Sequence, residues 1–258
     1  MSQTGPVIAI IQARIGSTRL PGKVLAELAG APMLQLQLER VQRAKTLDQI
    51  VVATSNHSSD DPIAALCANL GVPMYRGDLN DVLSRFAGAI SKFNPEIVVR
   101  ITADCPLMSP TVIDSIVNEF KEADVDYLSN TLQPTFPDGV DVEVVRADVL
   151  LDLSATSTDA AEREHVTLGV YRRPEKYSVA NFAGDVDLSD LRWTVDNRDD
   201  FEFVQWVYQE LFPNNPYFDV DDVLALLESQ PDRSRTSADS KRNAALDGLD
   251  TGAMLHKN

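Results

Sequence analysis

A segment near the start of the chain carries residue types that bind phosphate. Residues 12–23 contain three cationic side chains, those of Arg14, Arg19 and Lys23, and two glycines, Gly16 and Gly22. Glycines let backbone N–H groups approach a phosphate, and Arg and Lys supply charge where several anionic oxygens gather. The apolar run at residues 7–11, typical of a buried strand, directly precedes the segment. This position favours a polyphosphate site over the alternative, a solvated basic loop.

Two known phosphate-binding motifs do not fit this segment. The Walker A motif has four residues between its first glycine and its Gly-Lys pair, followed by Ser or Thr. Here Gly16 and Gly22 enclose five residues, and Lys23 is followed by Val24, so the hydroxyl that would bind magnesium is missing. The segment also lacks the G-x-G-x-x-G pattern of dinucleotide-binding proteins. The site therefore belongs to neither motif.

Asp104 is the carboxylate expected nearest to that segment. It follows a second apolar run, at residues 96–101, and Pro106 prevents the chain from continuing as a strand. A carboxylate that faces a triphosphate repels it unless a cation lies between them, so this position predicts a bound metal ion. The alternative is an aspartate that caps the following turn. A second carboxylate is expected within residues 185–200, where composition alone does not single out one of the many acids.

The elements that must position these residues alternate between strand and helix. Strands are predicted at residues 7–11, 49–54, 72–75 and 96–101, and helices at residues 32–45, 61–71, 81–93 and 110–123. This alternation is typical of βαβ units and predicts an α/β fold with a doubly wound, mostly parallel sheet. Ligands of such sheets bind outside the carboxyl ends of the strands. Residues 12–23 and Asp104 should therefore meet at one edge.

The second half is less regular. We expect strands at residues 127–128, 142–145, 177–182 and 192–195, a loop at 131–141, and helices at 159–169, 199–211 and 220–229. No linker within residues 1–230 is polar enough to divide them, which predicts a single domain. Small polar residues dominate residues 231–258, and we expect a mobile tail with one docking turn there.

Composition excludes several classes of function. The chain has 258 residues, with 23 Lys and Arg against 39 Asp and Glu, a formal net charge of −16. Such a surface repels nucleic acid and anionic membranes. No apolar stretch near the start is long enough to cross a bilayer, no signal peptide is evident, and two cysteines cannot form a disulfide framework. We therefore expect a cytoplasmic protein that neither binds nucleic acid nor inserts into a membrane.

Residues 12–23 read Gln-Ala-Arg-Ile-Gly-Ser-Thr-Arg-Leu-Pro-Gly-Lys, and this segment resembles the signature loop of the CMP-sugar synthetases. These cytidylyltransferases activate acylneuraminate and 3-deoxy-manno-octulosonate. Residues 76–86, 138–143 and 163–167 resemble the spore-coat polysaccharide biosynthesis branch, and the likeness covers residues 6–230. The resemblance implies a Rossmann-like nucleotidyltransferase fold and a homodimer formed through residues 130–180. It also implies transfer of CMP from CTP to a sugar or sugar acid, with release of pyrophosphate, for surface polysaccharide biosynthesis.

The resemblance also implies the roles of individual residues. The nucleotide would bind Gln12, Ala13, Arg14, Gly16, Ser17, Arg19, Lys23, Arg76, Asp81, Thr102 and Ala103. The acceptor would bind Asp138, Gly139, Asp141, Glu143, Glu164 and His165. Asp104 and Asp196 would hold Mg²⁺, and Arg14, Lys23 and Asp104 would be catalytic. A structural salt bridge for Arg76 and ordinary pairing on a helix face for Glu164 and His165 are the alternatives. Because two carboxylates held close together repel, neutralising Asp104 or Asp196 is not expected to destabilise the protein.

Two other functions compete with this one. A glycosyltransferase that uses a nucleotide-sugar has a similar fold but usually holds its metal with Asp-x-Asp, whereas the chain reads Asp104-Cys105-Pro106 at that place. A non-catalytic nucleotide-binding protein would keep the phosphate segment but lose the metal carboxylates, and both are present. Release of pyrophosphate from CTP separates the three functions.

Overall fold

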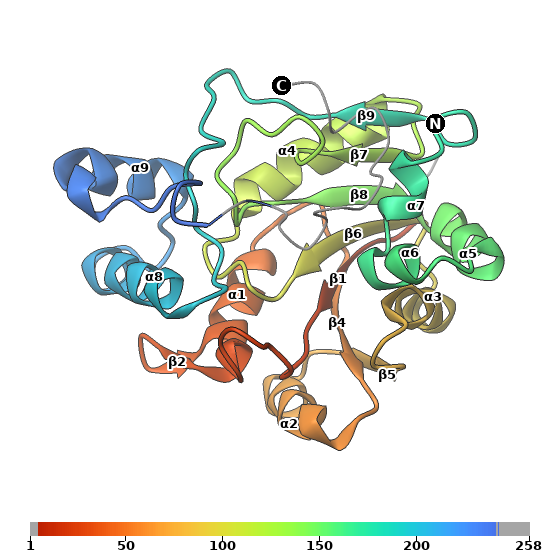
Figure 1. Cartoon of the computed structure of the whole chain (residues 1–258), viewed down its shortest axis with the longest axis horizontal. Helices are drawn as coiled ribbons and strands as arrows, with labels where there is room; N and C mark the ends of the chain where they lie inside the picture. Colours follow the sequence, from red (N-terminus) through yellow and green to blue (C-terminus); the bar gives the residue numbers. More distant parts are fainter. Residues whose placement is uncertain (1–4, 241, 243–258) are drawn as a thin grey trace.

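The computed structural model describes residues 5–240 and residue 242. Seven strands form one sheet in the order β5-β4-β1-β6-β8-β7-β9 (Figure 1). The strands, in sheet order, are β5 (Met74–Gly77), β4 (Gln49–Ser55), β1 (Val7–Gln12), β6 (Ile97–Thr102), β8 (Glu143–Arg146), β7 (Tyr127–Ser129) and β9 (Val179–Asn181). Only β8 runs antiparallel to its neighbours. The predicted doubly wound, mostly parallel sheet is thus confirmed.

The central strand β1 is apolar on both faces because helices cover both. Helices α1 (Met33–Val41), α2 (Asp61–Leu70) and α4 (Pro110–Glu122) pack with Val7, Ala9 and Ile11. Helices α3 (Val82–Phe93) and α5 (Ala147–Thr156) pack with Ile8 and Ile10 on the other face. Each such fully buried aliphatic side chain contributes about 1.5–3 kcal/mol of hydrophobic stabilisation. Burial on both faces therefore holds the carboxyl end of β1 rigidly in the middle of the sheet.

Local signals set the ends of several helices where the sequence predicts them. Gly71 adopts a left-handed conformation with φ of 66° and ends α2. The Ser109 hydroxyl accepts a hydrogen bond from the Val112 N–H, and Pro110 occupies the first turn of α4. Asn197 and Asp200 form a capping box at the start of α8 (Arg198–Leu211). Together with α9 (Val220–Ser229), α8 packs outside α1 at one side of the molecule (Figure 1).

The structure corrects the expected helix at residues 159–169. Two short helices, α6 (Ala160–His165) and α7 (Leu168–Tyr171), replace it. The break is at Val166, which is fully buried and has φ of 52°, a conformation that β-branched residues rarely adopt. Because periodicity does not reveal such a turn, the sequence predicted one continuous helix.

The expected strand at residues 192–195 is also wrong, since it forms only an isolated bridge between Arg192 and Asp138. Its N–H groups instead bond to loops: that of Trp193 donates to Asp138 O, and that of Val195 donates to Asp104 O. Helix α5 and the small hairpin of β2 (Glu27–Leu28) and β3 (Ala31–Pro32) were not predicted. The connection through residues 192–195 therefore ties two site loops together rather than extending the sheet.

The described part of the expected mobile tail packs against the domain. Arg235 O accepts a hydrogen bond from the Arg192 N–H, and the Ser237 N–H donates to Asp190 O. The expected tail also includes residues 241 and 243–258, which lie outside the described residues. Among residues 5–240 and 242, no helix is both long enough and apolar enough to span a lipid bilayer.

Candidate active site

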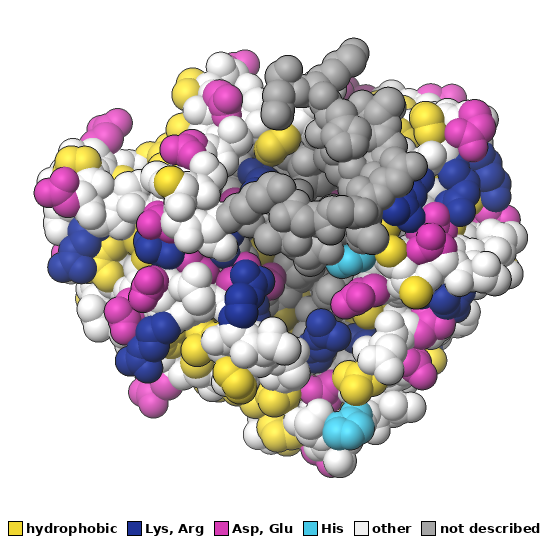
Figure 2. Space-filling view, in the orientation of Figure 1, with side chains coloured by type: hydrophobic (Ala, Val, Ile, Leu, Met, Phe, Trp, Pro, Cys, Tyr) yellow, Lys and Arg dark blue, Asp and Glu magenta, His cyan; other side chains and the backbone are white. Residues whose placement is uncertain are grey.

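A cavity of about 430 Å³ opens at the carboxyl ends of β1 and β6. Figure 2 shows acidic and basic side chains interspersed on this face of the molecule. Most residues that the sequence singles out line the cavity: Gln12, Ala13, Arg14, Gly16, Ser17, Arg19, Lys23, Thr102, Ala103, Asp104, Asp138, Asp141, Glu143, Glu164, His165 and Asp196. The parallel pairing of β1 with β6 brings the two ends together, because Gln12 and Thr102 are register partners. Residues 12–23 and Asp104 thus meet at one edge of the sheet, as expected, and line one cavity there.

The phosphate segment is held at its two ends and open in its middle. The Ile15 N–H donates to a carboxylate oxygen of Asp60, and the Gly22 N–H donates to Ile15 O. Gly22 has φ of 74°, which favours glycine and closes the loop. Within the described residues, the N–H groups of positions 16–19 have no protein acceptor. They are therefore available to an anion, as in a phosphate-binding nest.

Lys23 lies between the two carboxylates that the sequence assigns to a metal. Its Nζ is 3.1 Å from Oδ2 of Asp104 and 3.1 Å from Oδ1 of Asp196. It also donates to Val195 O at 2.6 Å. Burial by itself lowers the pKa of Lys23, but the two carboxylates outweigh burial and raise that pKa above its ordinary value. Burial likewise works to raise the pKa of Asp104, yet Lys23 holds it below its usual range. Lys23 and Asp104 are therefore both charged at neutral pH.

Arg192 holds the second carboxylate in place, and the sequence analysis missed it. Its guanidinium is only 2% exposed and donates to Asp138 and Asp196, each at 2.8 Å, and to Asp200 at 3.1 and 3.2 Å. Burial alone lowers the pKa of Arg192, but the bonds to Asp200 and Asp196 raise it overall. Arg235 adds a second cation to Asp200, at 3.2 Å. A lone arginine in the apolar run 191–195 was the signal that could have revealed it.

Three further acids, Asp138, Asp141 and Glu143, also line the cavity. Arg242 pairs with Asp141, while Glu143 accepts hydrogen bonds from Arg100 and from the Thr167 hydroxyl. Burial and the charge of Asp141 raise the pKa of Asp138 to about 7, although arginines oppose the shift. Asp138 and Asp141 thus form a pair in which one carboxyl holds a proton below that pH.

Three further predicted residues have different outcomes. His165 lies in the cavity at the end of α6, and burial lowers its pKa, so that it is neutral at pH 7. Neighbouring Glu164 lies 3.9 Å from Arg14, measured from Oε1 to Nη2. Gly139 does not line the cavity; with φ of 115°, a Cβ at this position would lie 2.6 Å from Thr194 N. Its role is to let the Asp138 loop pass close beside residues 193–194.

Arg76 and Asp81 lie outside the cavity. Arg76 donates to Ser55 O and His57 O and forms an ion pair with Asp61 at 2.8 Å, the structural alternative considered above. Asp81 caps α3 and forms an ion pair with Arg163. Several lining residues were not predicted from the sequence, among them Thr18, Arg85, Arg100, Thr131, Leu132, Thr167, Tyr171, Arg192 and Thr194. They come from many elements, so no local pattern marks them.

Three comparisons place this geometry among known proteins. Residues 8–214 match the model of a family described as cytidylyltransferase. The chain is 33% identical to the spore coat polysaccharide biosynthesis protein SpsF of Bacillus subtilis, over 88% of this chain and 95% of that protein. It is 40% identical to the 3-deoxy-manno-octulosonate cytidylyltransferase of Geobacter sulfurreducens, over 45% of this chain and 46% of that enzyme.

A solved structure agrees with these sequence matches. A cytidylyltransferase from Leptospira borgpetersenii superimposes with a TM-score of 0.84 and 30% sequence identity. The match covers 89% of this chain and 96% of that one. The likeness therefore extends over most of the chain.

Proposed function

Because this chain belongs to the cytidylyltransferase family, we propose that it transfers CMP from CTP to a sugar or sugar acid and releases pyrophosphate. The observation that carries this proposal is the convergence of the phosphate segment, Lys23, Asp104 and Asp196 in one cavity. By analogy with SpsF, the product would serve the synthesis of a surface polysaccharide. CTP selectivity, the acceptor class and the metal are parts of this proposal.

Asp104 and Asp196 suit a divalent cation because they already clamp a positive charge, the Lys23 ammonium. Within the described residues, no cluster of three or more His, Cys, Asp or Glu side chains could hold a metal. Mg²⁺ usually takes one or two carboxylates and completes its shell with phosphate oxygens and water. Two aspartates beside a triphosphate therefore fit Mg²⁺. When bound, Mg²⁺ would neutralise phosphate charge and favour attack at the α-phosphorus.

The chain's own residues would position the reactants and the leaving group. The free N–H groups of positions 16–19 would bind phosphate oxygens, and Arg14 and Arg19, both about half exposed, would contact the outer phosphates. An acceptor hydroxyl would attack the α-phosphorus, the bond to the β-phosphate oxygen would break, and pyrophosphate would leave. Asp138, with a pKa of about 7, would accept the hydroxyl proton. Catalysis on this scheme rests on positioning and charge neutralisation.

The test is pyrophosphate release from each of four nucleoside triphosphates, with Mg²⁺, across a panel of sugars and sugar acids. We expect release with CTP and not with ATP, GTP or UTP. CTP at about 100 times its Kd should also stabilise the fold by about 2.7 kcal/mol in thermal unfolding. Equal stabilisation by all four nucleotides would contradict a cytidylyltransferase while leaving a general phosphate site.

The dimer expected through residues 130–180 is a separate part of the proposal. Light scattering on the purified chain should give twice the chain mass of 28.4 kDa. A monomeric mass would remove the dimer without affecting the proposed reaction.

A further inference from the structure

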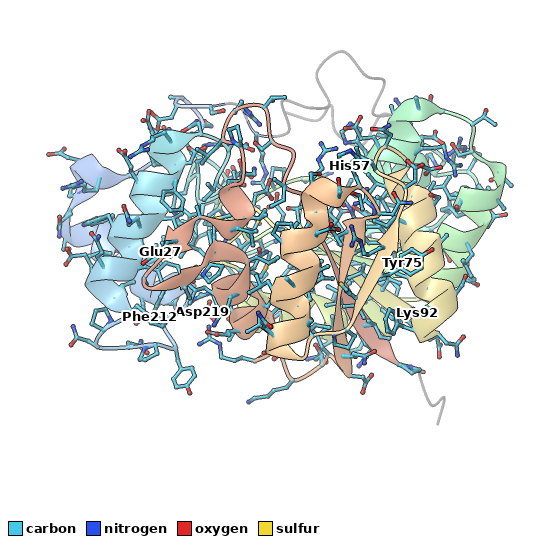
Figure 3. All side chains as sticks on the ribbon, turned by 90° about the horizontal axis from the view of Figure 1, so that it is seen from below. Glu27, His57, Tyr75, Lys92, Phe212 and Asp219 are labelled. Carbon is cyan, nitrogen blue, oxygen red and sulfur yellow. The ribbon has the colours of Figure 1, made fainter. Side chains whose placement is uncertain are left out.

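A second, smaller cavity lies away from the active site, between α1 and the end of α8. Its volume is about 180 Å³. The lining residues are Leu36, Glu39, Arg40, Arg43, Tyr208, Phe212, Pro216 and Tyr217. Figure 3 shows Phe212 and neighbouring Asp219 toward the edge of the molecule opposite to His57, which follows β4. The cavity therefore does not belong to the site described above.

Two arginines in this cavity have nitrogen atoms for which the described part of the chain provides no hydrogen-bond acceptor. Arg40 is 3% exposed; its Nε donates to Met108 O at 2.8 Å, while its Nη2 is buried without an acceptor. Nη2 lies 3.8 Å from Oδ1 of Asp219, which is too far for a hydrogen bond. Arg43 donates from Nη1 to Pro216 O, but its buried Nε also has no acceptor. Buried polar groups are normally satisfied, so these two call for an explanation.

The nearby carboxylates do not fully compensate the two positive charges. Glu39 accepts a hydrogen bond from Gln35, and Asp219 accepts hydrogen bonds from the Thr111 hydroxyl and the Val220 N–H. Burial lowers the pKa of Arg40 and the positive charge of Arg43 adds to this shift, while Tyr208 and Asp219 oppose it without reversing it. Desolvated cations with incomplete hydrogen bonding are costly. An anion in the cavity beside the two guanidinium groups would compensate their positive charge.

We propose that this cavity binds a small oxyanion, a phosphate or carboxylate group. Each guanidinium group lies over an aromatic ring. Cζ of Arg40 is 4.4 Å from the ring centre of Phe218, and Cζ of Arg43 is 5.2 Å from that of Tyr217. Stacking leaves the N–H edges for a planar or tetrahedral oxyanion, which arginine recognises well. The volume suits such a group but not a whole nucleotide. Because the chain has a net charge of −16, general attraction of anions would not imitate this binding.

The cavity is connected to the loop that carries Asp104. Arg40 donates to Met108 O, and the Tyr208 hydroxyl donates to Pro106 O at 2.9 Å. Both carbonyl groups belong to the turn that directly follows Asp104. An oxyanion that orders Arg40 and the surrounding side chains would therefore also steady this turn. The second cavity is therefore linked to the active site by hydrogen bonds from Arg40 in α1 and Tyr208 in α8.

The test is an NMR titration of the full chain that follows the arginine Nε–Hε signals. Sodium phosphate and sodium acetate are added separately, with sodium chloride at matched ionic strength as the reference. We expect the Arg40 and Arg43 signals to shift saturably with at least one oxyanion and not with chloride. The salt that acts then distinguishes a phosphate from a carboxylate ligand. No saturable shift with either oxyanion would overturn the proposal.

Matched variants locate the binding. Arg43→Gln should weaken it about tenfold or more, because one charged donor is lost. Lys176→Gln, which removes an exposed ion pair with Asp152, should leave the Arg40 shift unchanged. Tyr217→Ala is a second variant; Tyr217 is 75% exposed, so the fold should tolerate the change, and loss of this wall should also weaken binding. Unchanged binding in Arg43→Gln and Tyr217→Ala would overturn the proposal.

Discussion

Nζ of Lys23 lies 3.1 Å from Oδ2 of Asp104, although 81 residues separate the two in the chain. The Lys23 side chain is only 11% exposed, and it places a positive charge where the proposed function requires a metal ion. The sequence assigns Lys23 to the triphosphate and Asp104 to the metal. In the structure they form one charge cluster with Asp196, so a change in one must affect the other two.

Replacing Lys23 with glutamine should reduce both activity and stability. Pyrophosphate release should fall by about a hundredfold or more, because a charge that neutralises the phosphates is lost. The free energy of unfolding should fall by about 1–2 kcal/mol, since Asp104 and Asp196 would face one another without a cation. Urea unfolding without nucleotide measures the second effect. The matched control is Arg198→Gln, which removes an exposed pair with Glu202 and should cost at most about 0.5 kcal/mol.

The ion pairs of Asp196 change the effect on stability that the sequence predicted for its neutralisation. Besides Lys23, it contacts Arg19 at 3.0 Å and Arg192 at 2.8 Å. Asp196→Asn should therefore destabilise the free protein by about 1 kcal/mol, whereas charge repulsion between two aspartates had predicted no loss. Activity should fall by orders of magnitude, and Asp104→Asn/Asp196→Asn should be scarcely worse than either single variant. Near-normal activity and magnesium dependence in Asp196→Asn would show that another acid holds the metal.

Arg192→Met should cause the largest loss of stability among these variants. It would remove the ion-pair partner of Asp138, leave Asp196 with Lys23 and Arg19, and leave Asp200 with Arg235. Removing one partner from a buried ionic network typically costs about 3–5 kcal/mol. Urea unfolding beside the exposed control Arg198→Met measures the difference. A loss no larger than that of the control would mean that Arg192 does not organise the site.

The raised pKa of Asp138 predicts how stability depends on pH. The native protein keeps this proton up to about pH 7, whereas the unfolded chain loses it near its ordinary value of 3.8. The stabilising contribution is therefore complete below about pH 4 and is lost as the pH rises to about 7. Asp138→Asn should flatten this part of the stability profile by about 3 kcal/mol. Urea unfolding from pH 4.5 to 7.5 provides the measurement.

The exposed carboxylate of Asp185 supplies the matched control for this profile. Asp185→Asn should keep the wild-type dependence on pH. Parallel profiles for the wild type and Asp138→Asn would contradict the assignment of the proton to this residue.

Several features of the protein are determined by short-range patterns in its sequence. Gly71 ends α2, Ser109 with Pro110 begins α4, and apolar runs mark β1, β4 and β6. Each depends on the conformational preference or capping ability of neighbouring residues. Alternation of these elements determines a parallel sheet, and a parallel sheet brings strand ends together. The meeting of the phosphate segment with Asp104 therefore follows from the sequence.

Only the tertiary structure decided which charges pair. Arg192 reaches Asp138 across 54 residues, and Arg235 reaches Asp200 across 35. Nothing local distinguishes these residues from other charged ones, because their partners are set by the packing of whole elements. The turn at Val166 and the path of residues 192–195 are decided in the same way. Secondary structure depends on neighbours in the chain, whereas electrostatic pairing depends on distance in space, and that distance exists only once the core has packed.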